Sequence, residues 1–141
     1  FIKTQLNFNQ PKPKDFHNIL NVIGMSSCYS PNPRRKEYNF DLPFDIYTSE
    51  IIPKIWEKWL QFDPVRLVSK YKTNLKKLKM VFVDCGTRDE FNLQAGARIY
   101  SNKLKNNGIK FIHQEFNDGH MNIQYRYDTS FRFISEYFSY V

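Results

Sequence analysis

The chain has 141 residues, of which 41% are hydrophobic and 17% aromatic, so it can bury a core and is not a disordered chain. Its net charge is +7, but the basic residues are scattered, which favours a solvated surface over a nucleic-acid site. No apolar run approaches the ~20 residues that a membrane-spanning helix needs.

The first half of the chain contains one apolar run followed by a long polar segment. Residues 18–25 are short, apolar and β-branched, and predict a buried strand. Residues 30–45 are rich in proline, asparagine and charge, and predict a long loop. A helix is expected next, capped by Thr48 with Glu50 in its first turn. Its apolar face would comprise Ile51, Ile52, Ile55, Trp56 and Trp59.

The second half alternates strand and helix patterns. Asp63 and Pro64 predict a helix start, because aspartate caps helices and proline fits the first turn. Buried strands are predicted at residues 80–83 and 109–115, with a helix between them that ends at a left-handed Gly108. The faces of the last two helices would be Leu93, Ala97, Tyr100 and Leu104, and Tyr127, Phe131, Ile134 and Phe138.

This order of elements predicts an α/β fold with a mostly parallel sheet flanked by helices. We expect residues 1–141 to form a single domain around three strands. Three strands are few for a free-standing parallel sheet, so an exposed edge would favour self-association. Because the sequence opens with Phe1 and not with methionine, we expect it to be a piece of a longer chain.

Acidic residues follow the strand at residues 80–83, and a histidine follows the strand at 109–115. The carboxyl ends of neighbouring parallel strands lie at one edge of a sheet, where ligands bind in open α/β folds. The loop that carries Asp89 should therefore meet the loop that carries His120. An aspartate that orients a histidine is the acid–base pair of a catalytic triad.

Other residues compete for these two roles. Asp84 is an alternative acid at the end of the strand, whereas Asp118 is expected to shape its own turn. His113 lies within a strand and His17 precedes one, so both are expected to be packed or surface residues.

The nucleophile is harder to place. The G-x-S-x-G elbow of serine hydrolases does not occur, and the nearest string, GMSSC, lacks its last glycine. Ser26, Cys28 and Cys85 are therefore weaker candidates than a serine upstream of Phe1, for which FIKTQLNF would be the following helix. The two cysteines show no metal spacing and are expected to be buried free thiols. No metal or cofactor is expected.

Several of these strings together resemble the esterase D and enterochelin-esterase-like group of α/β hydrolases. In that family a D-x-G-x-x-D-x-F loop carries the catalytic acid and a G-H loop carries the base. The resemblance covers about residues 16–138 and implies that Asp89 is the acid and His120 the base. It also implies that the chain is the C-terminal part of a larger α/β-hydrolase domain, whose nucleophile elbow and oxyanion hole precede it. The matching strings are DCGTRDEF, GIKFIHQEFNDGH, YRYDTSFRFISEYF, NVIGMSSCYSPNP and DPVRLV.

Three functions follow from this interpretation. The first is a serine esterase that acts on a small-molecule ester through an upstream serine, so that the chain alone would be inactive. The second is a non-catalytic relative that binds a sugar or peptide, with Trp56, Trp59 and the loop from Tyr29 to Tyr47 as stacking surface. The third is an acyltransferase or peptidase with the same triad, where Tyr125–Tyr127 border the cleft. The compartment stays open, although free thiols fit a reducing cytoplasm.

Overall fold

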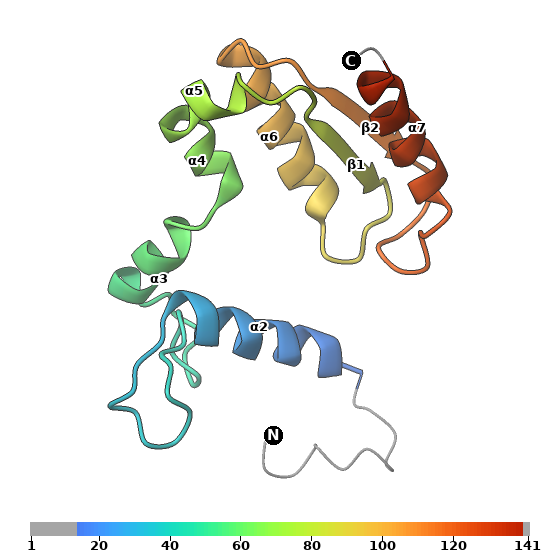
Figure 1. Cartoon of the computed structure of the whole chain (residues 1–141). Coiled ribbons are helices and arrows are strands. Elements are labelled where there is room, and N and C mark those ends of the chain that lie inside the picture. The colour runs from blue at the N-terminus through green and yellow to red at the C-terminus, as the bar shows by residue number, and fades with distance from the viewer. Residues whose placement is uncertain (1–13, 140–141) are drawn as a thin grey trace. The chain divides into compact units, whose positions relative to one another are not determined.

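The computed structural model describes residues 14–139 (Figure 1). The expected helix FIKTQLNF lies outside the described residues. The contacts divide the chain into an N-terminal unit, Phe1–Phe62, and a C-terminal unit, Asp63–Val141, and each is described by itself. The expectation of a single domain stays a prediction.

The N-terminal unit begins with a helix where the sequence predicted a strand. Helix α2 spans Phe16–Tyr29 and includes the whole run at residues 18–25, so the strand prediction was wrong. Periodicity alone cannot separate a short apolar strand from a helix, and a helix satisfies its backbone groups without a partner strand. Ile19, Val22 and Ile23 of α2 line an apolar groove of about 620 Å³ together with loop residues of the same unit.

The loop after α2 is long, as predicted, and folds on itself through two isolated antiparallel bridges, Pro31 with Phe40 and Phe44 with Ile51. Helix α3 spans Pro53–Leu60 and begins with its proline, so Thr48 is not its cap. The N–H of Thr48 instead donates to Oδ1 of Asp45, 2.9 Å away, in a turn that precedes the helix. Asp45 accepts the backbone N–H groups of Tyr47 and Thr48, so these residues form a turn around the aspartate and not the first turn of a helix.

Aromatic and hydroxyl side chains join α2 to α3 within the N-terminal unit. The indole N–H of Trp59 donates to the buried hydroxyl of Ser30 over 2.9 Å. Tyr29 stacks on Phe62 with ring centres 4.7 Å apart and meets Trp59 edge to face. Trp59 is thus a packing residue of this unit, whereas Trp56 is 38% exposed.

The C-terminal unit contains a mixed α/β arrangement. Within the described residues there is a single sheet, in which β1 (Phe82–Gly86) and β2 (Ile112–Phe116) run parallel. Each begins two or three residues later than the segment predicted, and the third strand expected at residues 18–25 is helical. The structure therefore confirms a mixed α/β class with a parallel sheet of two strands.

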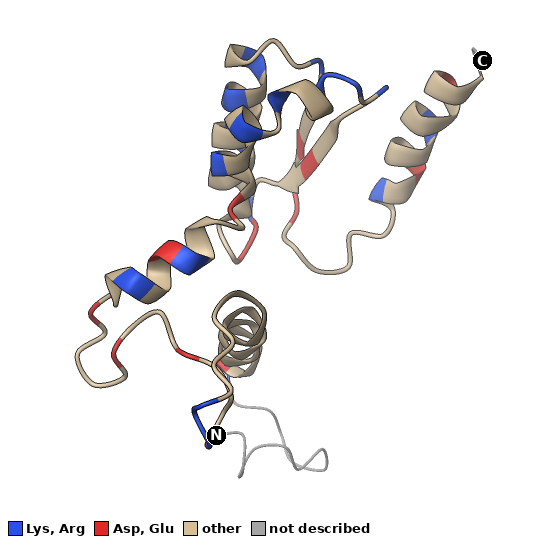
Figure 2. Ribbon diagram, turned by 60° about the vertical axis from the view of Figure 1, so that its left-hand side comes forward, with Lys and Arg blue, Asp and Glu red and all other residues tan. Residues whose placement is uncertain are grey.

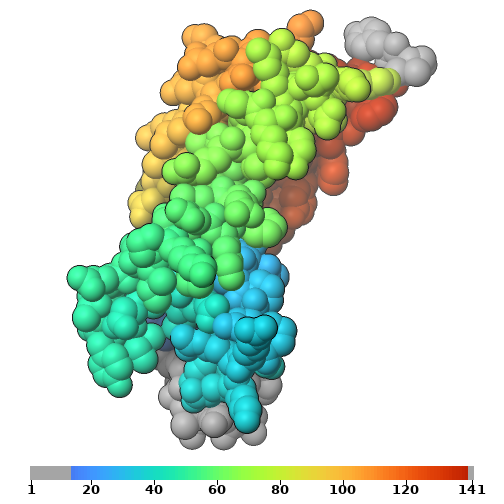
Figure 3. Space-filling view, turned by 90° about the vertical axis from the view of Figure 1, so that its left-hand side faces the viewer, coloured from blue at the N-terminus to red at the C-terminus, as the bar shows by residue number. Residues whose placement is uncertain are grey.

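Helices cover both faces of this small sheet (Figure 1). Helix α6 (Leu93–Asn106) packs on one face of β1, and Phe133 of α7 (Arg126–Phe138) packs on Phe82 from the other. Side chains alternate along a strand, so Phe82 and Asp84 face α7 while Cys85 points to the opposite side. Figure 3 shows α4 (Pro64–Lys70) and α5 (Lys72–Leu75) in green beside the orange end of α6.

The core of the C-terminal unit joins α4 to α6 through Val68, Leu104 and Ile109, which are all buried. Asp63 caps α4 as predicted, because its Oδ1 accepts from the N–H of Val65. The predicted end of α6 is also confirmed: Gly108 has φ of +64°, and the N–H of Ile109 donates to the carbonyl of Leu104. This left-handed cap places Ile109 against Leu104 and leads the chain into β2.

The last helix carries an exposed apolar face. Helix α7 includes the predicted residues, but Tyr127, Phe131 and Phe138 are each about 60% exposed. Figure 2 shows Lys and Arg residues on several of the described helices, interspersed in the chain with Asp and Glu. None of the helices in residues 14–139 combines the length and the apolar character that crossing a bilayer demands.

Candidate active site

The loops that follow β1 and β2 lie against each other at one edge of the sheet. Backbone hydrogen bonds continue the strand pairing past the strands: the N–H of Thr87 donates to the carbonyl of Phe116, and that of Arg88 to the carbonyl of Asp118. The guanidinium of Arg88 also donates to the carbonyl of Asn117 over 3.1 Å. The acidic loop and the histidine loop therefore meet, as the parallel topology predicted.

Two glycines allow this close approach. A Cβ atom on Gly86 would collide with the carbonyl oxygens of Asp118 and Gly119. A Cβ atom on Gly119 would lie 2.5 Å from Oε1 of Glu90. At Gly86 the colliding atoms belong to the backbone, so any larger residue would push the loops apart. At Gly119 they are the end of the Glu90 side chain, which a larger residue would displace. The glycine of the D-x-G string thus has a packing reason that is independent of chemistry.

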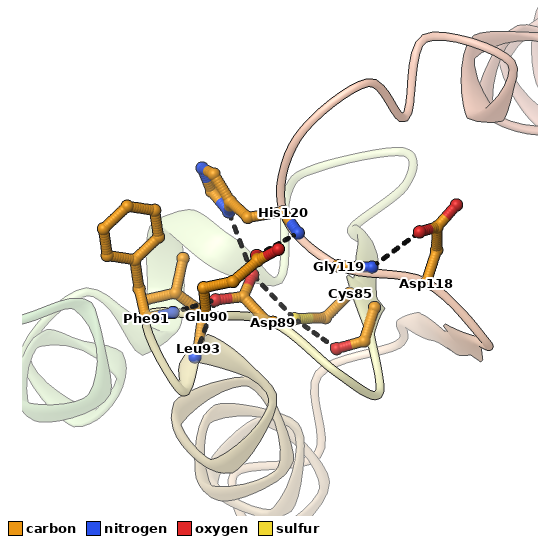
Figure 4. A network of polar contacts seen from close by, with 9 residues as sticks. Cys85, Asp89, Glu90, Phe91, Leu93, Asp118, Gly119 and His120 are labelled. Carbon is orange, nitrogen blue, oxygen red and sulfur yellow. Dashed lines mark hydrogen bonds and ion pairs between the residues drawn. The ribbon is translucent and has the colours of Figure 1, made fainter. Parts of the chain in front are cut away.

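The structure brings the predicted pair together. Nδ1 of His120 lies 2.9 Å from Oδ2 of Asp89, and Figure 4 shows this contact at the centre of a polar network. The Asp89 side chain is 2% exposed, whereas that of His120 is 39% exposed. Oδ1 of Asp89 accepts the backbone N–H of Phe91 at 2.8 Å and that of Leu93 at 3.4 Å. Backbone N–H groups at the start of α6 therefore fix the carboxylate through Oδ1, the oxygen that does not contact His120.

These contacts keep Asp89 ionised despite its burial. Burial alone would raise the pKa of Asp89, because it disfavours the charged form. The hydrogen bond from His120 and those from the N–H groups of Phe91 and Leu93 outweigh burial, so the pKa of Asp89 lies below its usual value. An ionised aspartate accepts hydrogen bonds only, so Nδ1 of His120 must be the protonated ring nitrogen.

The other ring nitrogen of His120 is free to take a proton. With Nδ1 protonated, Nε2 carries the lone pair, and Figure 4 shows it pointing away from Asp89. Among the described residues, none forms a hydrogen bond with Nε2. The ring of Phe91 meets the imidazole edge to face, with centres 5.0 Å apart. This is the arrangement of a general base: an oriented imidazole with a solvent-facing acceptor.

The competing aspartates have other partners. Asp84 forms a two-point ion pair with Arg126 of α7, at 2.9 and 3.2 Å, and Arg126 also donates to Gln114. Asp118 accepts the N–H of Gly119 and the hydroxyl of Tyr125, so it shapes its own turn as predicted. Asp84 therefore tethers α7 to the sheet and does not contact His120.

The remaining histidines have other neighbours within their own units. His113 lies within β2, as predicted, with its Nε2 4.0 Å from Glu115. His17 lies on α2 of the N-terminal unit beside Phe16 and does not precede a strand.

Of the weaker nucleophile candidates, Ser26 and Cys28 belong to the N-terminal unit and Cys85 to the C-terminal unit. The buried hydroxyl of Ser26 donates to the carbonyl of Val22, one turn earlier on α2. Cys28 is exposed on α2, which contradicts the prediction of a buried thiol, because that segment is a helix and not an internal strand. Cys85 is buried, and its Sγ lies 3.9 Å from Oδ2 of Asp89. Burial and neighbouring carboxylates raise the pKa of Cys85, so its thiol stays protonated.

Sequence reasoning missed Glu90. Its Oε2 accepts the backbone N–H of His120 over 2.7 Å, next to the Asp89 contact (Figure 4). The signal was the adjacent acidic pair in TRDEF, which resembled a solvated loop. Across residues 14–139, no three His, Cys, Asp or Glu side chains gather as a metal ion would require.

Neither the models of known protein families nor the curated proteins include a match to this chain.

Proposed function

We propose that Asp89 and His120 are the acid and base of a Ser-His-Asp triad in a carboxylic-ester hydrolase. The observation that carries this proposal is the 2.9 Å contact between Nδ1 of His120 and a buried, ionised Asp89. A carboxylate in that position orients the imidazole and stabilises the imidazolium that forms during the reaction. The opposite nitrogen then accepts the proton of the nucleophile.

In the proposed reaction, a serine hydroxyl attacks the carbonyl carbon of the ester. Its proton passes to Nε2 of His120, and the imidazolium returns that proton to the departing alkoxide as the acyl-enzyme forms. Water then repeats these transfers and releases the acid. Asp89 stays ionised throughout, and the chemistry assigned to this chain requires only proton movement at His120.

The serine is proposed to precede Phe1, in line with the resemblance to the esterase D and enterochelin-esterase-like α/β hydrolases. In the C-terminal unit the one thiol, Cys85, is buried, and its Sγ contacts Asp89 and not the imidazole. In that family the elbow strand precedes the acid and base strands in the chain. The residues described here would form the C-terminal part of the α/β-hydrolase sheet. The same triad also serves acyltransferases and peptidases, which differ in acceptor or substrate.

The test is labelling with a fluorophosphonate, which reacts with activated serines, on the protein in its longest natural form. We expect one labelled serine before Phe1, with labelling lost in His120→Ala. The matched control is His113→Ala, which removes another histidine of the same unit and should label normally. No labelling of the folded parent would overturn the esterase and favour a binding relative. Labelling that survives His120→Ala would overturn the assigned base.

A further inference from the structure

Three consecutive residues of the acidic loop contact His120 at three different places. Asp89 bonds to ring nitrogen Nδ1, Phe91 meets the ring edge to face, and Glu90 accepts the backbone N–H. The first two contacts fix where the ring points. The Glu90 contact fixes the main chain from which the ring projects. This contact has no role in the proposed triad.

The Glu90 contact is short, and its carboxylate lies against the glycine that precedes the histidine. His120 N to Glu90 Oε2 is 2.7 Å, which is short for a backbone donor and typical of a charged acceptor. The carboxylate covers Gly119 so closely that a Cβ atom there would lie 2.5 Å from Oε1 and 2.9 Å from Oε2. Asp118 accepts the preceding N–H, that of Gly119, at 2.8 Å. Two successive N–H groups of the histidine loop are thus bound by carboxylates.

We propose that Glu90 is a positioning residue that holds the backbone of His120 so that its imidazole stays on Asp89, an inference that rests on the proposed function. Without this bond, the main chain of His120 has no hydrogen bond to the described residues, and the residue is held through Nδ1 and Phe91 alone. Proton transfer depends steeply on placement, and a displacement near 1 Å can cost about 100-fold in rate. Glu90 acts through His120 and does not itself touch substrate.

The role requires an acceptor at this position and not a negative charge. The amide oxygen of glutamine can accept the same backbone N–H, whereas alanine leaves that donor without a partner. A residue that only added charge near the histidine would lose its effect in Glu90→Gln as well. Rescue by glutamine therefore separates positioning from electrostatics. Glu136, on α7, forms no hydrogen bond or ion pair with the described residues and is the matched control.

The experiment compares the parent with Glu90→Ala, Glu90→Gln and Glu136→Ala in the longest natural form. Fluorophosphonate labelling should be about 10-fold slower in Glu90→Ala, and within about 2-fold of the parent in the other two variants. NMR of the imidazole should show a protonated Nδ1 in the parent. That proton should exchange with water faster in Glu90→Ala and return to the parent rate in Glu90→Gln.

Each outcome decides a separate question. Parent-like labelling and an unchanged Nδ1 proton in Glu90→Ala would overturn the role of Glu90. An alanine-like Glu90→Gln would overturn the acceptor argument. If the folded parent takes no label, the proposed hydrolase fails, while the Nδ1 exchange rates still show whether Glu90 positions His120. If the melting temperature of Glu90→Ala falls, the proposal is judged on Glu90→Gln, because glutamine has nearly the same side-chain volume as glutamate.

Discussion

In the N-terminal unit, buried hydroxyls bond mostly to nearby backbone carbonyls, whereas in the C-terminal unit polar side chains from two distant loops converge on one histidine. The hydroxyl of Ser26 donates to the carbonyl of Val22 one turn earlier, and the hydroxyl of Ser30, at the end of α2, donates to the carbonyl of Asp41. His120 and Asp89, by contrast, are two ionisable side chains that bond to each other across 31 residues of sequence. Local bonds complete the ends of helices and turns. A bond between a carboxylate and an imidazole orients a group that can transfer protons, and that difference locates the candidate site.

A second contrast is in the carboxylates of the C-terminal unit. Asp84 and Asp89 are five residues apart, yet one pairs with Arg126 on the α7 face and the other with His120 beyond the strand end. The first tethers a helix to the sheet, and the second is buried with a half-exposed imidazole as its partner. Substituting each aspartate in turn tests whether reactivity depends on the carboxylate that bonds to His120 or on any carboxylate near the end of β1.

The largest expected effect is on labelling in Asp89→Asn. Asparagine can present an N–H to Nδ1 and favour the wrong tautomer, so we expect labelling of the activated serine to slow by about 10⁴-fold. Asp84→Asn is the matched control, because it also removes one carboxylate near the end of β1. It should label within about 10-fold of the parent, since it leaves His120 untouched. An equal loss of labelling rate in the two variants would contradict a specific role of the Asp89–His120 pair, because Asp84 pairs with Arg126 of α7 and not with His120.

The next effect is on stability, in Gly86→Ala. The new Cβ would strike the carbonyl oxygens of Asp118 and Gly119, which are backbone atoms that cannot rotate away. We expect a loss of about 3 kcal/mol in the free energy of unfolding, measured by urea denaturation. Gly96→Ala, on α6 of the same unit, has nothing within 4 Å of the new Cβ and should gain about 0.5–1 kcal/mol. A tolerated Gly86→Ala would contradict the close packing of the two loops.

The pairing of Asp89 with His120 could be predicted from sequence because parallel strands end at the same edge of a sheet. That argument needs only the order of elements and not their exact bounds, so it survived strand shifts of two or three residues. The end of α6 was equally predictable, since Gly108 alone provides the left-handed cap. In both cases a local pattern and a topological rule point to the same residues.

Other features depend on context that a local pattern does not contain. Residues 18–25 are apolar and β-branched, but in helix α2 the interior backbone groups bond to one another, and no strand in the described residues pairs with this segment. Thr48 matched the pattern of a helix cap, yet its own N–H and that of Tyr47 donate to Asp45 in a turn that precedes the helix. Glu90 resembled a solvated charge because its partner is a backbone N–H 30 residues away.

Acid should weaken the contribution of Asp89 to stability. Its pKa is lower in the folded protein than in the unfolded chain, where aspartate titrates near 3.9. The stabilisation is therefore fully present above about pH 4 and is lost as the pH falls through the folded pKa. Urea denaturation of the parent and Asp89→Asn should give a difference in the free energy of unfolding that shrinks as the pH falls below about 4. A difference that grows in acid would contradict an ionised Asp89.

The smallest expected effect belongs to the N-terminal unit, in Trp59→Phe. The change keeps an aromatic ring beside Tyr29 but removes the indole N–H that donates to the buried hydroxyl of Ser30. We expect a loss of about 1 kcal/mol in the free energy of unfolding, the net value of one such hydrogen bond. The Nδ1 proton of His120 should exchange as in the parent, because both partners of this bond belong to the N-terminal unit. Altered exchange at His120 would show that the two units share an energetic network, and would remove the contrast between them.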